Sequence, residues 1–159
     1  MLNTFYELNV LCEFPPNQNW ELLYRATRDG FDAKDFHRIC DHKRNTLTVI
    51  KSTHGNIFGG YNDEAWDSTN RYYDDSNAFL YSLVNKDNKS FKVNIPKNSI
   101  CCNSSYGPSF GIGHDICISS NSNINSESFS FFGLSTKLKS IFAGSYKFQT
   151  VEIEVFNKI

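Results

Sequence analysis

The segment Thr150-Val-Glu-Ile-Glu-Val-Phe156, close to the C-terminus, carries the clearest structural signal in the chain. In it, Val151, Ile153 and Val155 alternate with two glutamates. Successive side chains of a β-strand point to opposite faces of the sheet. The alternation therefore predicts a strand whose three apolar residues share a buried face while the glutamates face solvent. The fold must then contain at least one sheet that is buried on one side.

Two hairpins and several short strands are predicted upstream of this segment. Thr46–Thr53 is rich in β-branched residues, and His54-Gly55-Asn56 supplies a turn into Ile57–Tyr61. A polar turn likewise joins Ala78–Val84 to Ser90–Ile95, which predicts a second hairpin. Weaker strand signals lie at Trp20–Arg25, Ser99–Cys102, His114–Ser119 and Phe129–Leu134.

One helix is predicted, over about Asp32–Asp41, because Ala33, Phe36, His37 and Cys40 recur at helical spacing. An aspartate before the first turn is a favourable N-cap, since its carboxylate accepts a hydrogen bond from a free N–H group of that turn. Short strands, polar turns and a single supported helix favour an α+β fold with antiparallel sheets in a sandwich over a doubly wound parallel fold.

Three further segments are expected to lie outside the sheets. Residues 104–113 are glycine-rich and residues 119–130 are rich in Asn and Ser, so both are predicted to be loops. The prolines at Pro15-Pro16 break any helix before the domain proper. We therefore expect a shortened lead-in segment over residues 1–19 and a single domain over residues 20–159.

Composition excludes several classes of protein. The chain has 159 residues, of which 40% are hydrophobic and 24 are aromatic, enough for a core, and a formal net charge of −1 gives no field that would gather nucleic acid. No apolar run approaches the ~20 residues of a membrane-spanning helix, and the first basic residue is Arg25, so no signal peptide is expected. Five cysteines, an odd number, fit reduced thiols in the cytoplasm.

Combinations of cysteine and histidine permit metal or thiol chemistry on paper. His37, Cys40 and His42 together with His114 and Cys117 supply zinc-ligand types. However, His42 lies beyond the predicted helix, and His114 and Cys117 point to opposite faces of their predicted strand. We therefore expect no metal and no cofactor.

A nucleophilic enzyme is also disfavoured. Cys117, His114 and Asp115 are the residue types of a catalytic triad, but on a strand Asp115 and Cys117 share one face while His114 points away. Glu152 and Glu154 share a strand face about 7 Å apart, which a solvated outer face explains without catalysis. No catalytic residue is assigned.

The glycine-rich segment Tyr106–His114 invites a phosphate-loop interpretation, but it lacks the Gly-Lys-Ser/Thr sequence and the Gly-x-Gly-x-x-Gly spacing. Structural glycines explain it better, because glycine tolerates positive φ and close approach of the backbone. The glycines for which we expect such structural roles are Gly30, Gly59, Gly60, Gly107, Gly111, Gly113 and Gly144.

Candidate partner-contacting residues are charged or aromatic side chains beside predicted loops. Near Gly30, mixed charges either contact a partner or pair with one another, and we favour pairing. Trp66 and Tyr61 suit an interface anchor, and Trp66 suits a core position equally well. The full set of candidates is Arg28, Asp29, Tyr61, Trp66, His114 and Asp115.

Eight motifs in order give the chain a resemblance to a known family. They are Leu22–His37 with Cys40-Asp41, Thr46–Thr53, Gly55–Tyr61, Trp66, Asn77–Leu83, Ser105–Asp115, Ala143–Tyr146 and Val151–Phe156. In this order they resemble a TLDc domain over about Trp20 to Phe156. The form with Arg28-Asp29-Gly30-Phe31 and Phe36-His37 resembles protist and fungal members.

The resemblance implies a two-sheet antiparallel β-sandwich with flanking helices. It also implies a non-enzymatic protein-interaction module associated with oxidative-stress resistance, with subunits of the vacuolar proton ATPase as the partner class. The expected location is the cytoplasm, peripheral to vacuolar or endosomal membranes through that partner. Two alternatives remain: an adaptor for an unrelated signalling partner, and a thiol-based redox or metal-assisted enzyme, which requires an accessible thiol of low pKa.

Overall fold

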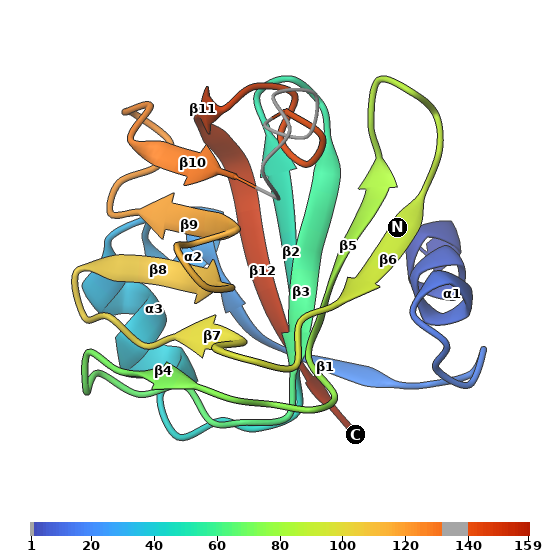
Figure 1. The fold of residues 1–159 in the computed structure, drawn as a ribbon, viewed down its shortest axis with the longest axis horizontal. Coiled ribbons are helices and arrows are strands. Elements are labelled where there is room, and N and C mark those ends of the chain that lie inside the picture. The colour runs from blue at the N-terminus through green and yellow to red at the C-terminus, as the bar shows by residue number, and fades with distance from the viewer. Residues whose placement is uncertain (1, 132–139) are drawn as a thin grey trace.

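Two six-stranded antiparallel sheets pack face to face in the computed structural model, which describes residues 2–131 and 140–159 (Figure 1). The first sheet has the order β1 (Trp20–Arg25), β12 (Thr150–Lys158), β2 (Thr46–Ser52), β3 (Ile57–Asn62), β5 (Phe79–Val84) and β6 (Phe91–Asn94). The second has the order β11 (Lys147–Phe148), β10 (Ser128–Ser130), β9 (Ile116–Ser119), β8 (Tyr106–Phe110), β7 (Ile100–Cys101) and β4 (Tyr72–Tyr73). The predicted α+β sandwich and both predicted hairpins are confirmed.

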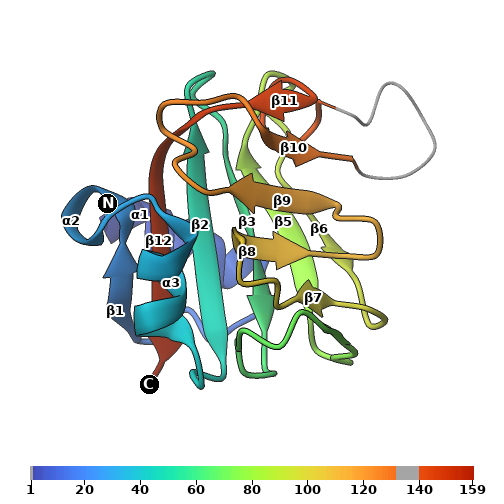
Figure 2. The same cartoon turned by 90° about the vertical axis from the view of Figure 1, so that its left-hand side faces the viewer.

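Within the described residues, three helices flank the sheets: α1 (Leu2–Leu11), α2 (Ala26–Asp29) and α3 (Ala33–Cys40). The predicted helix is α3, and its N-cap Asp32 accepts a hydrogen bond of 3.1 Å from the backbone N–H of Lys34. Figure 2 shows α3 beside β1 and β8, where it links the two sheets. The single turn α2 was not predicted, because four residues are too few to show a helical period.

The core between the sheets is aromatic. Trp66 packs its ring edge-on against Phe36 and Phe110, with centroids 5.3 and 5.4 Å apart, and all three side chains are buried. Ile153 and Val155 of β12 enter the same core, as the sequence predicts. The first sheet therefore has the buried inner face that the alternation in β12 required.

A second apolar cluster covers the outer face of the first sheet. Helix α1 lies on that face, opposite the second sheet (Figure 1). Its buried Leu8 belongs to a cluster with Leu47 and Phe156, and the rings of Phe5 and Phe156 meet edge-on with centroids 4.9 Å apart. The helix ends before Pro15, in agreement with the proline signal. The first sheet is thus buried on both faces along part of its length.

The prediction that Val151 shares a buried face with Ile153 and Val155 is wrong. The pairing of β12 with β2 matches Thr150 to Ser52 and Glu152 to Lys51, which leaves Val151 as an extra residue. Such a bulge turns a side chain out of the regular alternation. Val151 is 46% exposed, whereas Ile153 and Val155 are buried.

Two predicted loops contain strands, which corrects the sequence assignment. Residues 104–113 include β8, whose Gly107 and Pro108 have low strand propensity but lie buried between β7 and β9. The register of β8 on β9 shifts between Tyr106 and Ser109, and proline is tolerated at such irregularities. Residues 119–130 end in β10. The predicted strand Phe129–Leu134 lies partly outside the described residues.

Candidate partner-binding groove

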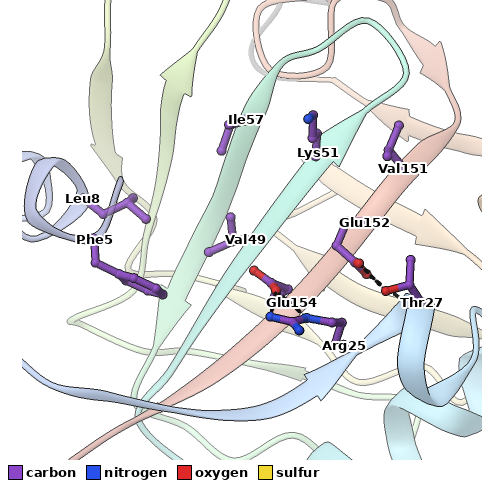
Figure 3. Close-up of a pocket in the computed structure, with 10 residues that line it drawn as sticks. All are labelled: Phe5, Leu8, Arg25, Thr27, Val49, Lys51, Ile57, Val151, Glu152 and Glu154. Carbon is purple, nitrogen blue, oxygen red and sulfur yellow. Dashed lines mark hydrogen bonds and ion pairs between the residues drawn. The ribbon is translucent and has the colours of Figure 1, made fainter. Parts of the chain in front are cut away.

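A groove of about 450 Å³ lies on the outer face of the first sheet, between α1 and α2 (Figure 3). One side is apolar, with Phe5 and Leu8 from α1 and with Val49, Ile57 and Val151 from three strands of the sheet. Helix α1 covers the part of this face around Leu47, and the groove begins where that cover stops. The sheet therefore presents apolar side chains at a site that its own helix leaves open.

Strand alternation and the bulge together produce this apolar side. Along β2, Leu47, Val49 and Lys51 share the outer face, so the strand runs from a buried residue through a half-buried one to an exposed one. The extra residue in β12 adds Val151 to the same side. A regular β12 would have placed Val151 with Ile153 in the core.

The other side of the groove is polar. Arg25 holds Glu154, with its Nε and Nη2 each 2.7 Å from Oε1, and Glu154 is only 8% exposed. Glu152 accepts hydrogen bonds from the hydroxyl and the backbone N–H of Thr27 and from the backbone N–H of Ile153. The two glutamates that were expected to face open solvent are thus held by donors at the groove.

Lys51 contributes the remaining charge of the groove. It lies opposite Glu152 in the pairing of β12 with β2, yet Glu152 is held on the side of Thr27 (Figure 3). Within residues 2–131 and 140–159, Lys51 forms no ion pair. Its exposed ammonium group is therefore available to a ligand.

Arg28 and Asp29 pair with each other, as favoured above. Arg28 Nη2 lies 2.8 Å from Asp29 Oδ2 and also donates to the backbone oxygen of Leu23, while Asp29 accepts from the backbone N–H of Arg25. The hydrogen bond from Arg28 is the largest cause of a lowered pKa of Asp29. The pair satisfies backbone groups of the edge strand β1.

Tyr61 and Trp66 are core residues in this structure, so neither is exposed to anchor a partner. Trp66 has 0% exposure, and its Nε1 donates a 2.9 Å hydrogen bond to the hydroxyl of Thr46. Tyr61 packs under α1, and its hydroxyl donates to a carboxylate oxygen of Asp63. The open question about Trp66 is decided in favour of the core.

His114 and Asp115 lie in the turn between β8 and β9, before the strand in which they were predicted. The ring of His114 lies among aromatic residues, with centroids 5.8 Å from Tyr72 and 6.0 Å from Phe129. Burial lowers the pKa of His114 and raises that of Asp115 to about 6. This turn joins two strands of the second sheet, and neither residue lines the groove on the first sheet.

The five cysteines are free and buried. Burial raises the pKa of each thiol, to about 12 for Cys12, Cys102 and Cys117. A thiol of high pKa carries little thiolate at neutral pH and is a poor nucleophile. The structure thus opposes the accessible, low-pKa thiol that a redox enzyme requires.

The histidines and cysteines do not gather into a metal site among the described residues. Nδ1 of His37 lies 2.7 Å from Asp41 Oδ1, and Nε2 lies 3.0 Å from the backbone oxygen of Tyr106. Both ring nitrogens are therefore occupied: Nδ1 contacts the C-cap residue of α3, and Nε2 contacts the backbone of β8. The described part of the chain also holds no helix long and apolar enough to cross a membrane.

The glycine predictions separate into two groups. Positive φ is found at Gly30, Gly111, Gly113 and Gly144. Close approach is found at Gly59, where an added Cβ would lie 1.9 Å from a backbone oxygen, and at Gly60, where it would lie 2.7 Å from the ring of Phe110. Gly107 does not have a positive φ and lies in β8, where an added Cβ would lie 3.3 Å from Cγ2 of Ile118, so it belongs with the close-approach group.

Sequence reasoning missed the groove as a site. The outward alternation of Val49, Lys51, Glu152 and Glu154 was a readable signal, but it gave no indication that α1 covers only part of the sheet.

The comparisons with known proteins agree with the architecture. The TLDc domain family matches residues 2–158. Three relatives are named MTOR-associated protein MEAK7: the protein of Danio rerio is 28% identical over 64 residues, that of Xenopus laevis 27% over 79, and that of Gallus gallus 30% over 67. These matches cover 40%, 48% and 40% of this chain but only 14%, 16% and 14% of the relatives. The resemblance to protist and fungal members of the family stays a prediction.

Proposed function

This chain belongs to the TLDc domain family, and we propose on that basis that it works as a non-enzymatic protein-interaction module. Similarity to proteins named MTOR-associated supports a protein-binding role. The buried thiols oppose the alternative of a thiol-based enzyme. A binding module requires a surface that a partner can bury, and the groove beside α1 meets that requirement.

The groove is the observation that carries this proposal. Exposed apolar side chains rimmed by charged ones are typical of surfaces that bind other proteins. Val151 and Lys51 are exposed on this surface, while Val49 and Ile57 form its half-buried floor.

Two partner classes are proposed. The TLDc resemblance favours subunits of the vacuolar proton ATPase and a role in oxidative-stress resistance, with the chain in the cytoplasm and reaching vacuolar or endosomal membranes through that partner. The second class is a signalling complex that contains mTOR, because the vertebrate relatives are named MTOR-associated. Because the matched segments are a small share of those relatives, either partner is a proposal for this chain.

Affinity capture tests the proposal. The tagged full chain is incubated with cytosol and membrane extract of its own cells, before and after oxidant treatment, and bound proteins are identified by mass spectrometry. Enrichment of vacuolar ATPase subunits supports the first partner class, and enrichment of mTOR components supports the second. If repeated capture under gentle conditions enriches no protein over a tag-only control, the interaction function is wrong.

A further inference from the structure

We propose that the groove beside α1 binds an amphipathic helix of a partner protein, with acidic residues flanking the apolar stripe of that helix. The inference rests on the proposed interaction function and names the surface and the chemistry of the partner. Three features of the groove carry it: the adjoining helix, the exposed apolar floor and the unpaired lysine.

The position of α1 favours a helix as the occupant. Phe5 and Leu8 of α1 form one wall of the groove, and Thr27 of α2 lies at the opposite wall (Figure 3). Helices on one face of a sheet commonly lie side by side, 8–10 Å apart, and bury an apolar stripe on the strands. Addition of a partner strand to the nearby edge of the sheet is disfavoured, because side chains of α2 already form hydrogen bonds with Leu23 O and Arg25 N of β1. A second helix beside α1 therefore suits this face.

The floor of the groove requires an apolar stripe on that helix. Val49 and Ile57 are only half-buried, and Val151 is 46% exposed because the bulge turns it outward. Docking a helix there would remove these side chains from water, which is the main source of favourable free energy when a helix binds a groove.

The charges of the groove require acidic residues beside the stripe. Arg25 pairs with Glu154. Glu152 forms no ion pair within the described residues, but its carboxylate accepts three hydrogen bonds, two from Thr27 and one from the backbone N–H of Ile153. Among the charged side chains of the groove, Lys51 is the one that has neither an ion pair nor a hydrogen bond within the described residues. Charge complementarity at a partly buried rim suppresses partners of the wrong sign, so a carboxylate is favoured opposite Lys51 and an ammonium is disfavoured.

A selection experiment tests this assignment. A display library of 18-residue helical peptides, with leucines at i, i+3, i+7 and i+10 and random residues beside them, is selected on the full chain. We expect Asp and Glu to be enriched at least threefold over Lys and Arg beside the leucines. A labelled selected peptide should then lose at least tenfold in affinity, by fluorescence polarisation, for Lys51→Glu and for Val151→Asp.

Matched substitutions outside the groove provide the control. Lys86→Glu reverses an exposed lysine in the β5–β6 turn, and Ile124→Asp replaces an apolar side chain that is 75% exposed. Both should leave the affinity within twofold of the original. Circular dichroism melting of all four variants checks that each is folded.

The outcomes separate this inference from the proposed function. Enrichment of basic residues, failure to select any binder, or equal binding to Lys51→Glu and Val151→Asp would each overturn the groove assignment. If affinity capture then still recovers a partner with both variants, the interaction function stands and another surface carries it. If that partner is lost with both groove variants but is retained with both control variants, the result supports the interaction function and the groove assignment together.

Discussion

The hydroxyl of Tyr81 donates a hydrogen bond of 2.8 Å to the backbone oxygen of Thr48, and it reaches that oxygen by crossing over Gly59. Tyr81 lies on β5, Gly59 on β3 and Thr48 on β2, so one side chain ties three neighbouring strands. The side chain of Tyr81 is fully buried, in the apolar cluster that includes Leu8 of α1. It explains why glycine is required in the middle of a sheet.

Replacing Gly59 by alanine should destabilise the fold by about 3 kcal/mol, at the upper end of overpacking costs, because the added Cβ would meet a backbone oxygen at 1.9 Å. Urea unfolding measures the change. Gly55→Ala is the control: nothing lies within 4 Å of its Cβ, and its positive φ costs only about 1 kcal/mol. Equal losses in the two variants would contradict the crowding argument.

Tyr81→Phe should cost about 1 kcal/mol of unfolding free energy, since it removes the hydrogen bond and leaves the ring in place. Burial raises the pKa of Tyr81 well above 10, so the hydroxyl remains a donor across the working pH range. Unfolding curves from pH 6 to 9 provide the measurement. A loss that disappears toward pH 9 would show that the hydroxyl ionises and that its burial is weaker than described.

The thiols should resist modification in the folded chain. With the pKa of Cys12, Cys102 and Cys117 raised to about 12, each should react with a disulfide reagent at least tenfold more slowly than free cysteine at pH 7.5. All five should react at once in 6 M guanidinium. One fast thiol in the native state would revive the enzyme hypothesis.

Asp115 should make stability depend on pH in a direction opposite to that of a paired carboxylate. Its pKa is raised to about 6 by burial, so the folded state binds the proton more tightly than the unfolded state does. Stability is therefore lost as pH rises from about 4 to about 6, and the loss is complete above that window.

The substitution Asp115→Asn removes the titrating carboxyl group and therefore its contribution to the pH dependence of stability. The variant should gain about 1 kcal/mol over the original chain as pH rises through the window, less than the full shift implies because the carboxyl group is partly exposed to solvent, and the gain should stay constant above pH 7. Urea unfolding at pH 4, 5, 6 and 7.5 measures it. Asp87→Asn, in an exposed turn, is the control and should show no such gain. A gain that is the same at pH 4 and pH 7.5 would contradict the protonation argument.

The parts of the fold that sequence could predict are those that depend on local periodicity. Thr46–Thr53 with Ile57–Tyr61, and α3 with its Asp32 cap, need only their own residues to be recognised. Strand β8 needed more, because Gly107 and Pro108 form a strand only with β7 and β9 on either side. Tertiary contacts there override a propensity that indicates a loop.

The groove was beyond sequence for the same reason. Val151 leaves the face of Ile153 because β12 pairs with β2 in a shifted register, and no local pattern encodes that shift. The burial of Trp66 likewise depends on where a polar loop places it between the sheets. Local alternation placed Lys51 and Glu152 on their strands, but only the assembled sheet shows that they rim one surface.

The pairing of Arg28 with Asp29 has a consequence for the solubility of the chain at high concentration. A bare edge strand is a template for aggregation, because its free backbone groups recruit strands from other molecules. Here Arg28 and Asp29 occupy Leu23 O and Arg25 N. The single turn α2 thus hinders intermolecular β-assembly at this edge through Arg28 and Asp29, while its Ala26 is buried in the hydrophobic core.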